Sequence, residues 1–169
     1  SANTRSFTLP DVATGLGGIT EFDQWYLTSN ITSDGDITSN LSRNDKTGAP
    51  SQIGTGMSQS SGIFTFPTTG KYLVIVSAEF GLNGSDNINL RTKVTTNNSS
   101  YSNQGRCIDG NNGTGERSGN ATSFSFIDVT DTSQVKVKFN VSSISSGSRV
   151  TGDSTDISTT FVFIRLGDT

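Results

Sequence analysis

The chain has 169 residues, of which 30% are hydrophobic and 16% charged, and its formal net charge is −3. Ser, Thr, Asn and Gly dominate the rest, a composition typical of all-β domains with many turns and unlike that of a helical bundle. The Lys and Arg residues are scattered singly and no apolar run reaches the length of a membrane span, so we expect neither nucleic acid nor a membrane as a partner.

The beginning of the chain differs from the rest. Residues 1–20 contain a proline and three glycines with little periodicity, which predicts an extended N-terminal arm, while residues 21–169 predict one domain. Within the arm, Phe7 and Leu9 have the spacing of a short strand that pairs with a partner. Ser1 fits a chain that has lost only its initiator methionine, so we expect synthesis in the cytoplasm without a leader.

From residue 22 onward the sequence alternates between strands and turns, and no window shows a period of 3.6 residues. A period of two, bounded by turn-forming residues, predicts strands at 22–28, 37–43, 62–66, 71–80, 88–96, 121–129, 134–143 and 157–169. The polar stretch 97–120 predicts a long loop with one short strand around residues 106–108. In total we expect eight to ten strands and no helix.

The last strand is apolar on both faces. Phe161, Phe163 and Arg165 share one face, and an apolar set shares the other. Two interpretations remain open. A partner subunit covers the second face, in which case Arg165 needs a carboxylate or carbonyl partner. Alternatively, the segment is a central strand of a two-sheet sandwich, with Arg165 near its exposed end.

The residue types disfavour catalysis. Histidine is absent, which removes Ser-His and Cys-His nucleophiles and the commonest zinc ligand. Cys107 is the only cysteine, so no internal disulfide can form, and we expect it to be a small buried hydrophobe. Glutamate occurs only at positions 21, 79 and 116, and the aspartates lie in turn-like settings, which disfavours a glycosidase pair. We therefore predict that the protein is not an enzyme.

Two further motifs fall short of a ligand site. "TTGKY" at residues 68–72 looks like the end of a nucleotide-binding loop, but its glycine spacing is wrong and a β-branched run follows it instead of a helix. We interpret it as a turn. "DGD" at 34–36 and "DSTD" at 153–156 offer oxygen ligands, yet neither completes a calcium loop. We expect no cofactor, with a loop-bound calcium ion as the alternative.

The segment "SGIFTFPTTGKYLV" resembles the signature of the jelly-roll family that includes the complement heads and the tumour-necrosis-factor-like cytokines. The family pattern Gly-x-Phe-x-x-Pro-x-x-Gly-x-Tyr is matched by Gly62, Phe64, Pro67, Gly70 and Tyr72. The terminal "TTFVFIRLGD" resembles the closing strand of the family. "EFDQWYLTSNIT" and "IGTGMSQSSGIFTFP" look like structural proteins of bacteriophages, particularly those of cyanobacteria. The resemblance covers roughly residues 20–169.

The resemblance implies an all-β, two-sheet antiparallel jelly-roll sandwich of about ten strands that forms homotrimers. It places the last strand near the three-fold axis, and the residues expected at the trimer interface are Trp25, Tyr72, Phe161, Phe163 and Arg165. The Gly/Asn-rich stretch 97–120 departs from the family. Fold alone leaves the function open.

Our functional expectation is a non-enzymatic phage virion protein, made in the host cytoplasm and located on the capsid surface. We expect a trimeric capsid decoration (cement) protein whose arm, through Arg5, Phe7 and Leu9, grips the major capsid protein. The alternative is a receptor-binding tip or small fibre that binds host polysaccharide through the loops at 97–120 and 144–156. A secreted carbohydrate hydrolase or lectin is a weaker third class.

Overall fold

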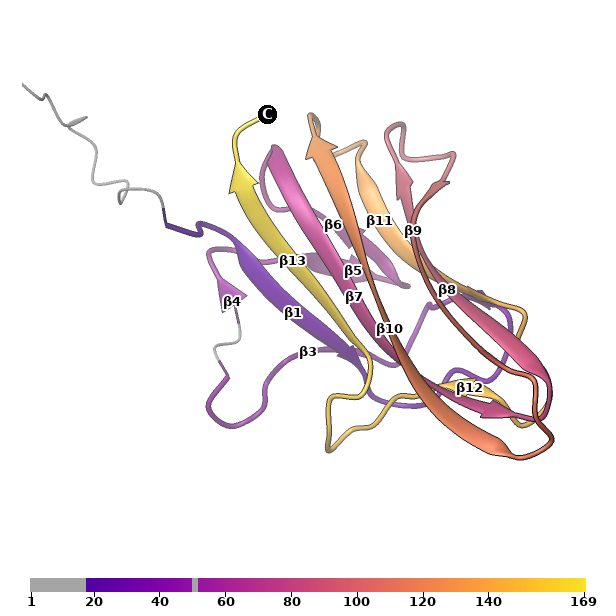
Figure 1. Ribbon diagram of the computed structural model, residues 1–169. Coiled ribbons are helices and arrows are strands. Elements are labelled where there is room, and N and C mark those ends of the chain that lie inside the picture. The colour runs from indigo at the N-terminus through magenta and orange to yellow at the C-terminus, as the bar shows by residue number, and fades with distance from the viewer. Residues whose placement is uncertain (1–17, 50–51) are drawn as a thin grey trace, which may run out of the picture.

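The computed structural model describes residues 18–49 and 52–169, and Figure 1 shows them as two antiparallel β-sheets packed face to face. Most of the predicted arm, with Arg5, Phe7 and Leu9, lies outside the described residues. The described part of the chain contains no helix, and so none long and apolar enough to cross a membrane. The prediction of an all-β jelly-roll sandwich is confirmed.

The first sheet, called sheet A, has the strand order β10-β7-β13-β1-β3, with β4 beside β1 and β12 beside β7. Its long central strands hydrogen-bond in register over most of their length. The strands are β1 (Phe22–Leu27), β3 (Leu41–Arg43), β4 (Gln52–Ile53), β7 (Gly70–Asn83), β10 (Glu116–Val129), β12 (Arg149–Val150) and β13 (Thr160–Gly167).

The second sheet, called sheet B, has the order β5-β6-β11-β8-β9, with β2 beside β11. The strands are β2 (Gly35–Asp36), β5 (Ser58–Ser60), β6 (Ile63–Thr65), β8 (Asp86–Thr95), β9 (Ser102–Asn111) and β11 (Lys136–Ser142). β9 lies at the edge of sheet B and β10 at the edge of sheet A, so the β9–β10 hairpin crosses from one sheet to the other. Such crossovers between two sheets define a jelly roll.

The core lies between the two sheets and follows from the period-two alternation of the strands. Phe64 occupies its centre, with its ring centroid 5.3 Å from Trp25, 5.6 Å from Phe139 and 5.1 Å from Phe163. Phe139 also stacks on Phe161 at 4.1 Å. Each fully buried phenylalanine contributes about 1.5–3 kcal/mol through loss of exposed apolar surface. This aromatic cluster therefore fixes the two sheets against each other.

Residues 67–69 ("PTT") form a bend between β6 and β7, and "GKY" opens β7, which confirms that the stretch is a turn leading into a strand. Gly70 opens β7 with a φ of 143°, and a Cβ atom there would lie 2.6 Å from the carbonyl oxygen of Gly167. Gly62 has a φ of 79° just before β6, and its missing Cβ leaves room for the backbone of Ile37. Only glycine meets both demands without strain.

The strand predicted at 37–43 is limited to β3, and the one predicted around 106–108 is longer than expected, but the structure departs most from the predictions in the polar stretch 97–120. It contains β9, and β10 begins at Glu116, five residues before the predicted start at 121. Between residues 102 and 120, Cys107 and Ile108 are the only large apolar residues of these strands, so no period-two alternation marks them in the sequence. The loop proper is short: Asn111 closes it with hydrogen bonds to Gly113 and Gly115 at 2.9 and 2.8 Å.

Candidate functional site

Four of the five residues predicted at the trimer interface lie in the core instead. Tyr72, Phe161 and Phe163 are at most 1% exposed and Trp25 is 9% exposed, because all four point inward between the sheets. A partner subunit has no access to side chains that the chain's own second sheet covers. Their assignment to the interface is therefore wrong, and β13 is a central strand of the sandwich, as the second interpretation of the last strand predicts.

Arg165, the fifth residue, lies near the end of β13. Its Nε donates a hydrogen bond of 3.0 Å to the carbonyl oxygen of Thr69, and its guanidinium forms an ion pair with Asp168. The side chain covers the glycine at position 70. The carboxylate and carbonyl partners that the buried charge requires are therefore supplied within the chain, and Arg165 ties the C-terminus to the turn before β7.

The outer face of sheet A carries an apolar surface that the core does not use. Hydrogen-bonded neighbours align side chains across the strands: Phe126 lies opposite Leu73, Leu73 opposite Ile164, and Ile164 opposite Phe22. A second row runs parallel to the first. We call the whole set the outer apolar patch; it comprises Phe22, Leu73, Ile75, Phe124, Phe126, Val162 and Ile164.

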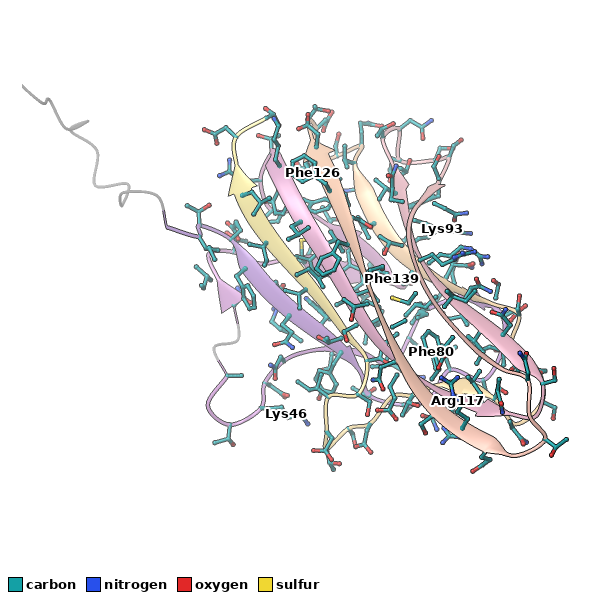
Figure 2. The ribbon with its side chains drawn as sticks, in the orientation of Figure 1. Lys46, Phe80, Lys93, Arg117, Phe126 and Phe139 are labelled. Carbon is teal, nitrogen blue, oxygen red and sulfur yellow. The ribbon has the colours of Figure 1, made fainter. Side chains whose placement is uncertain are left out.

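Two of the seven patch residues are exposed, the other five are half-buried, and polar residues border the set. Phe124 and Phe126 on β10 are 65% and 60% exposed, and Figure 2 labels Phe126 on this strand. Next to the row that contains Phe126, Asp128 lies opposite Lys71. Next to the row that contains Phe124, the hydroxyl of Thr122 lies 3.3 Å from that of Ser77. An apolar centre within a polar rim is the usual anatomy of a protein interface. Two adjacent exposed phenylalanines are unusual on a monomer surface.

Sequence reasoning missed this patch. The signal lies in "SFSFI", where Phe124 and Phe126 alternate with a serine, so the larger apolar residues of β10 face away from the core. The sequence of a strand alone does not show which of its two faces packs against the core. Only the register with β7 shows which face meets the second sheet.

Beside the patch, two buried carboxylates hold the loop that precedes β5. Asp23 is 1% exposed and accepts hydrogen bonds from Trp25 Nε1 at 2.9 Å and from the backbone nitrogen of Met57 at 2.7 Å, and it pairs with Arg43 at 2.9 Å. Glu21 accepts a hydrogen bond of 2.9 Å from the backbone nitrogen of Gly56, which precedes Met57. Because backbone and indole donors occupy these oxygens, the pair stabilises the fold and is not arranged for acid–base chemistry.

Cys107 is buried, as predicted. Burial raises the pKa of its thiol, and a contact of 3.4 Å to the hydroxyl of Ser123 only partly opposes this effect. A thiol with a raised pKa forms little of the reactive thiolate. Its sulfur also lies 3.4 Å from the carbonyl oxygen of Val76, inside the sandwich.

The aspartates considered as calcium ligands have protein partners. Asp36 forms an ion pair of 2.7 Å with Lys138, and Asp34 accepts a backbone hydrogen bond of 2.8 Å. Asp153 closes its own turn by accepting bonds of 2.6 Å from the nitrogen and the hydroxyl of Thr155. Within residues 18–49 and 52–169, no group of three or more His, Cys, Asp or Glu side chains could hold a metal ion.

Neither the protein-family models nor the curated proteins give a match to this chain. Solved structures do. Murine APRIL at pH 5.0 is similar with a TM-score of 0.64 at 11% identity, over 86% of this chain and 98% of that chain. The Eiger TNF of S. frugiperda has a TM-score of 0.64 at 13% identity, over 88% of this chain and 93% of that chain. These likenesses show a tumour-necrosis-factor-like jelly roll and indicate no enzyme family.

Proposed function

We propose that the protein is a non-enzymatic structural protein of a bacteriophage virion, most specifically a homotrimeric capsid decoration (cement) protein. The outer apolar patch is the observation that carries the proposal, because it is an assembly surface without an accompanying catalytic group. The phage assignment itself is supported by the resemblance of "EFDQWYLTSNIT" and "IGTGMSQSSGIFTFP" to phage structural proteins.

A second and third copy of the chain are the proposed cover of the patch. The patch spans four neighbouring strands and two rows of cross-strand partners, and its only charged neighbours lie at the rim. A contact that relates each copy to the next by the same rotation closes into a ring, and three copies form the trimer that the fold resemblance implies. The exposed phenylalanines of β10 supply the large aromatic anchors that dominate interface energies.

The position of the chain start supports a capsid contact. β1 begins at Phe22, which is itself a member of the patch, so the residues before β1 leave the domain beside the proposed trimer contact. In a trimer, three arms would therefore start close together around one axis. Three linked arms bind a symmetric capsid site with an effective concentration far above that of one arm. We propose that Arg5, Phe7 and Leu9 make this contact with the major capsid protein.

Cosedimentation with capsids that lack the protein tests the proposal. The full chain is expected to bind, and a variant without residues 1–20 is expected to remain a trimer but to lose binding. A Lys46→Gln variant, which changes one half-buried cation outside both the patch and residues 1–20, serves as the control and should bind normally. Equal capsid binding by the full and the shortened chains would show the proposed arm contact to be wrong. Absence of capsid binding by the full chain would refute the decoration role.

A further inference from the structure

The outer face of sheet B gathers positive charge that is dispersed in the sequence. Arg91 and Lys93 alternate on β8, Lys136 and Lys138 alternate on β11, and Arg106 lies on β9. Their strands are neighbours, so the five side chains share one surface, called here the basic face. They are five of the twelve Lys and Arg residues in a chain of net charge −3. Figure 2 labels Lys93 on this side of the sandwich.

Like charges lie directly opposite each other on the basic face. Lys93 is the cross-strand partner of Lys138, and Arg91 is the partner of Arg106. Such pairs place their Cβ atoms about 4.5–5.5 Å apart and destabilise a sheet. Asp36 forms an ion pair with Lys138, whereas the other two acids on the described strands of sheet B, Asp86 and Asp109, contact Ser145 and Arg117 instead. An anion bound across the strands would remove the remaining repulsion.

The pKa of Asp36 reflects this excess of positive charge. Its partial burial raises the pKa, but hydrogen bonds from Lys138 and Asn140 and the nearby charges of Lys138 and Lys93 outweigh that effect and lower the pKa. Among the described residues, the side chains of Lys93 and Arg106 have no hydrogen-bonding or ion-pair partner, and the guanidinium of Arg91 hydrogen-bonds only to the hydroxyl of Ser142. Their donors are free for a ligand.

The basic face also provides neutral donors and acceptors. An irregularity in the β8–β9 register, between Thr92 and Lys93, lies beside a shallow hollow of about 400 Å³. The lining residues of the hollow are Arg91, Asn103, Gln104, Gly105 and Arg106. Amide side chains beside guanidinium groups can bind sugar hydroxyls and acidic groups together.

We propose that the basic face binds an acidic polysaccharide, a sugar chain that bears carboxylate or sulfate groups. The unpaired cations would contact the acidic groups, and the amides of the hollow would contact the hydroxyls. Nucleic acid fits less well, because single strands stack their bases on exposed aromatic rings, and Lys138 already covers the ring of Tyr101 at 4.1 Å. The inference does not depend on the proposed function, since the outer faces of the two sheets point away from each other and the patch remains free.

Biolayer interferometry with immobilised polymers tests the inference. The probes are polygalacturonate, dextran sulfate, neutral dextran, oligothymidine and polyglutamate. The full chain is expected to bind the two acidic polysaccharides and not the neutral dextran, and the binding should weaken as added salt screens the charges. A Lys93→Gln/Arg106→Gln variant removes two unpaired cations and should reduce the affinity on the order of tenfold.

The matched control is Lys46→Gln/Arg117→Gln, which removes the same charge from positions off the basic face and should bind normally. Equal losses in the two double variants would overturn the inference, because they would show an effect of net charge alone. Equally tight binding to oligothymidine or polyglutamate would also overturn it, since the site would then recognise any polyanion. Lack of binding to both acidic polysaccharides would do the same.

Discussion

Replacing both exposed phenylalanines of β10 by serine, Phe124→Ser/Phe126→Ser, should abolish the trimer and leave the monomer folded. A phenylalanine side chain presents about 200 Å², so at 65% and 60% exposure each residue offers roughly 120–130 Å² for burial in a partner. At about 25 cal/mol per Å² this is about 3 kcal/mol for each residue and about 6 kcal/mol for each contact. Imperfect burial and ordering costs reduce the figure, but a loss of several kcal/mol weakens association by at least a factor of about 10³.

Sedimentation velocity over a range of protein concentrations measures the effect. The parent protein should sediment as a trimer and the double variant as a monomer with an unchanged far-ultraviolet circular dichroism spectrum, because neither side chain belongs to the core. Ile63→Ser, which removes an exposed apolar residue from sheet B, is the control and should remain trimeric. A double variant that stays trimeric, or a parent chain that is monomeric at micromolar concentration, would refute the reasoning about the patch.

Three further predictions concern the stability of the domain. Gly62→Ala forces a Cβ atom against a backbone carbonyl at positive φ and should cost at least about 2 kcal/mol in urea unfolding, whereas Gly84→Ala, at positive φ in open space, should cost about 1 kcal/mol. Asp23→Asn breaks the ion pair with Arg43 and should cost about 3 kcal/mol in the same assay; an unchanged midpoint would contradict the structural role of this carboxylate. The folded-state pKa of Asp36 is lowered, so its ionised form stabilises the fold above the unfolded pKa of about 3.9, and this stabilisation is lost as the pH falls through the lower folded pKa. Thermal melts should therefore show that the Asp36→Asn variant loses less stability in acid than the parent protein.

The sequence was sufficient to predict the strands whose apolar residues alternate strongly. β11, with Val137, Phe139 and Val141 facing inward between polar neighbours, is the clearest case. The turn before β7 was also predictable, because Pro67 and Gly70 have few other roles at that spacing. Both predictions rest on local geometry, which the residue types determine directly.

Properties that depend on the pairing of distant strands could not be predicted. β13 is apolar on both faces, and only its position beneath sheet B shows that Phe161 and Phe163 are core residues while Val162 and Ile164 face outward. The basic face was hidden for the same reason. Arg91 and Arg106 are separated along the chain, and the β8–β9 register alone makes them neighbours.

The short hairpin tip at residues 112–115 has a practical consequence. It joins β9, which contributes to the basic face, to β10, which carries the exposed phenylalanines, yet it belongs to neither surface. A Cβ atom at Gly115 would meet open space, and the residues of the tip lie at the surface. Exposed tips of this kind tolerate inserted sequence well. A foreign peptide inserted here should leave both surfaces intact, so the tip offers a site for displaying peptides in several copies on each assembled particle.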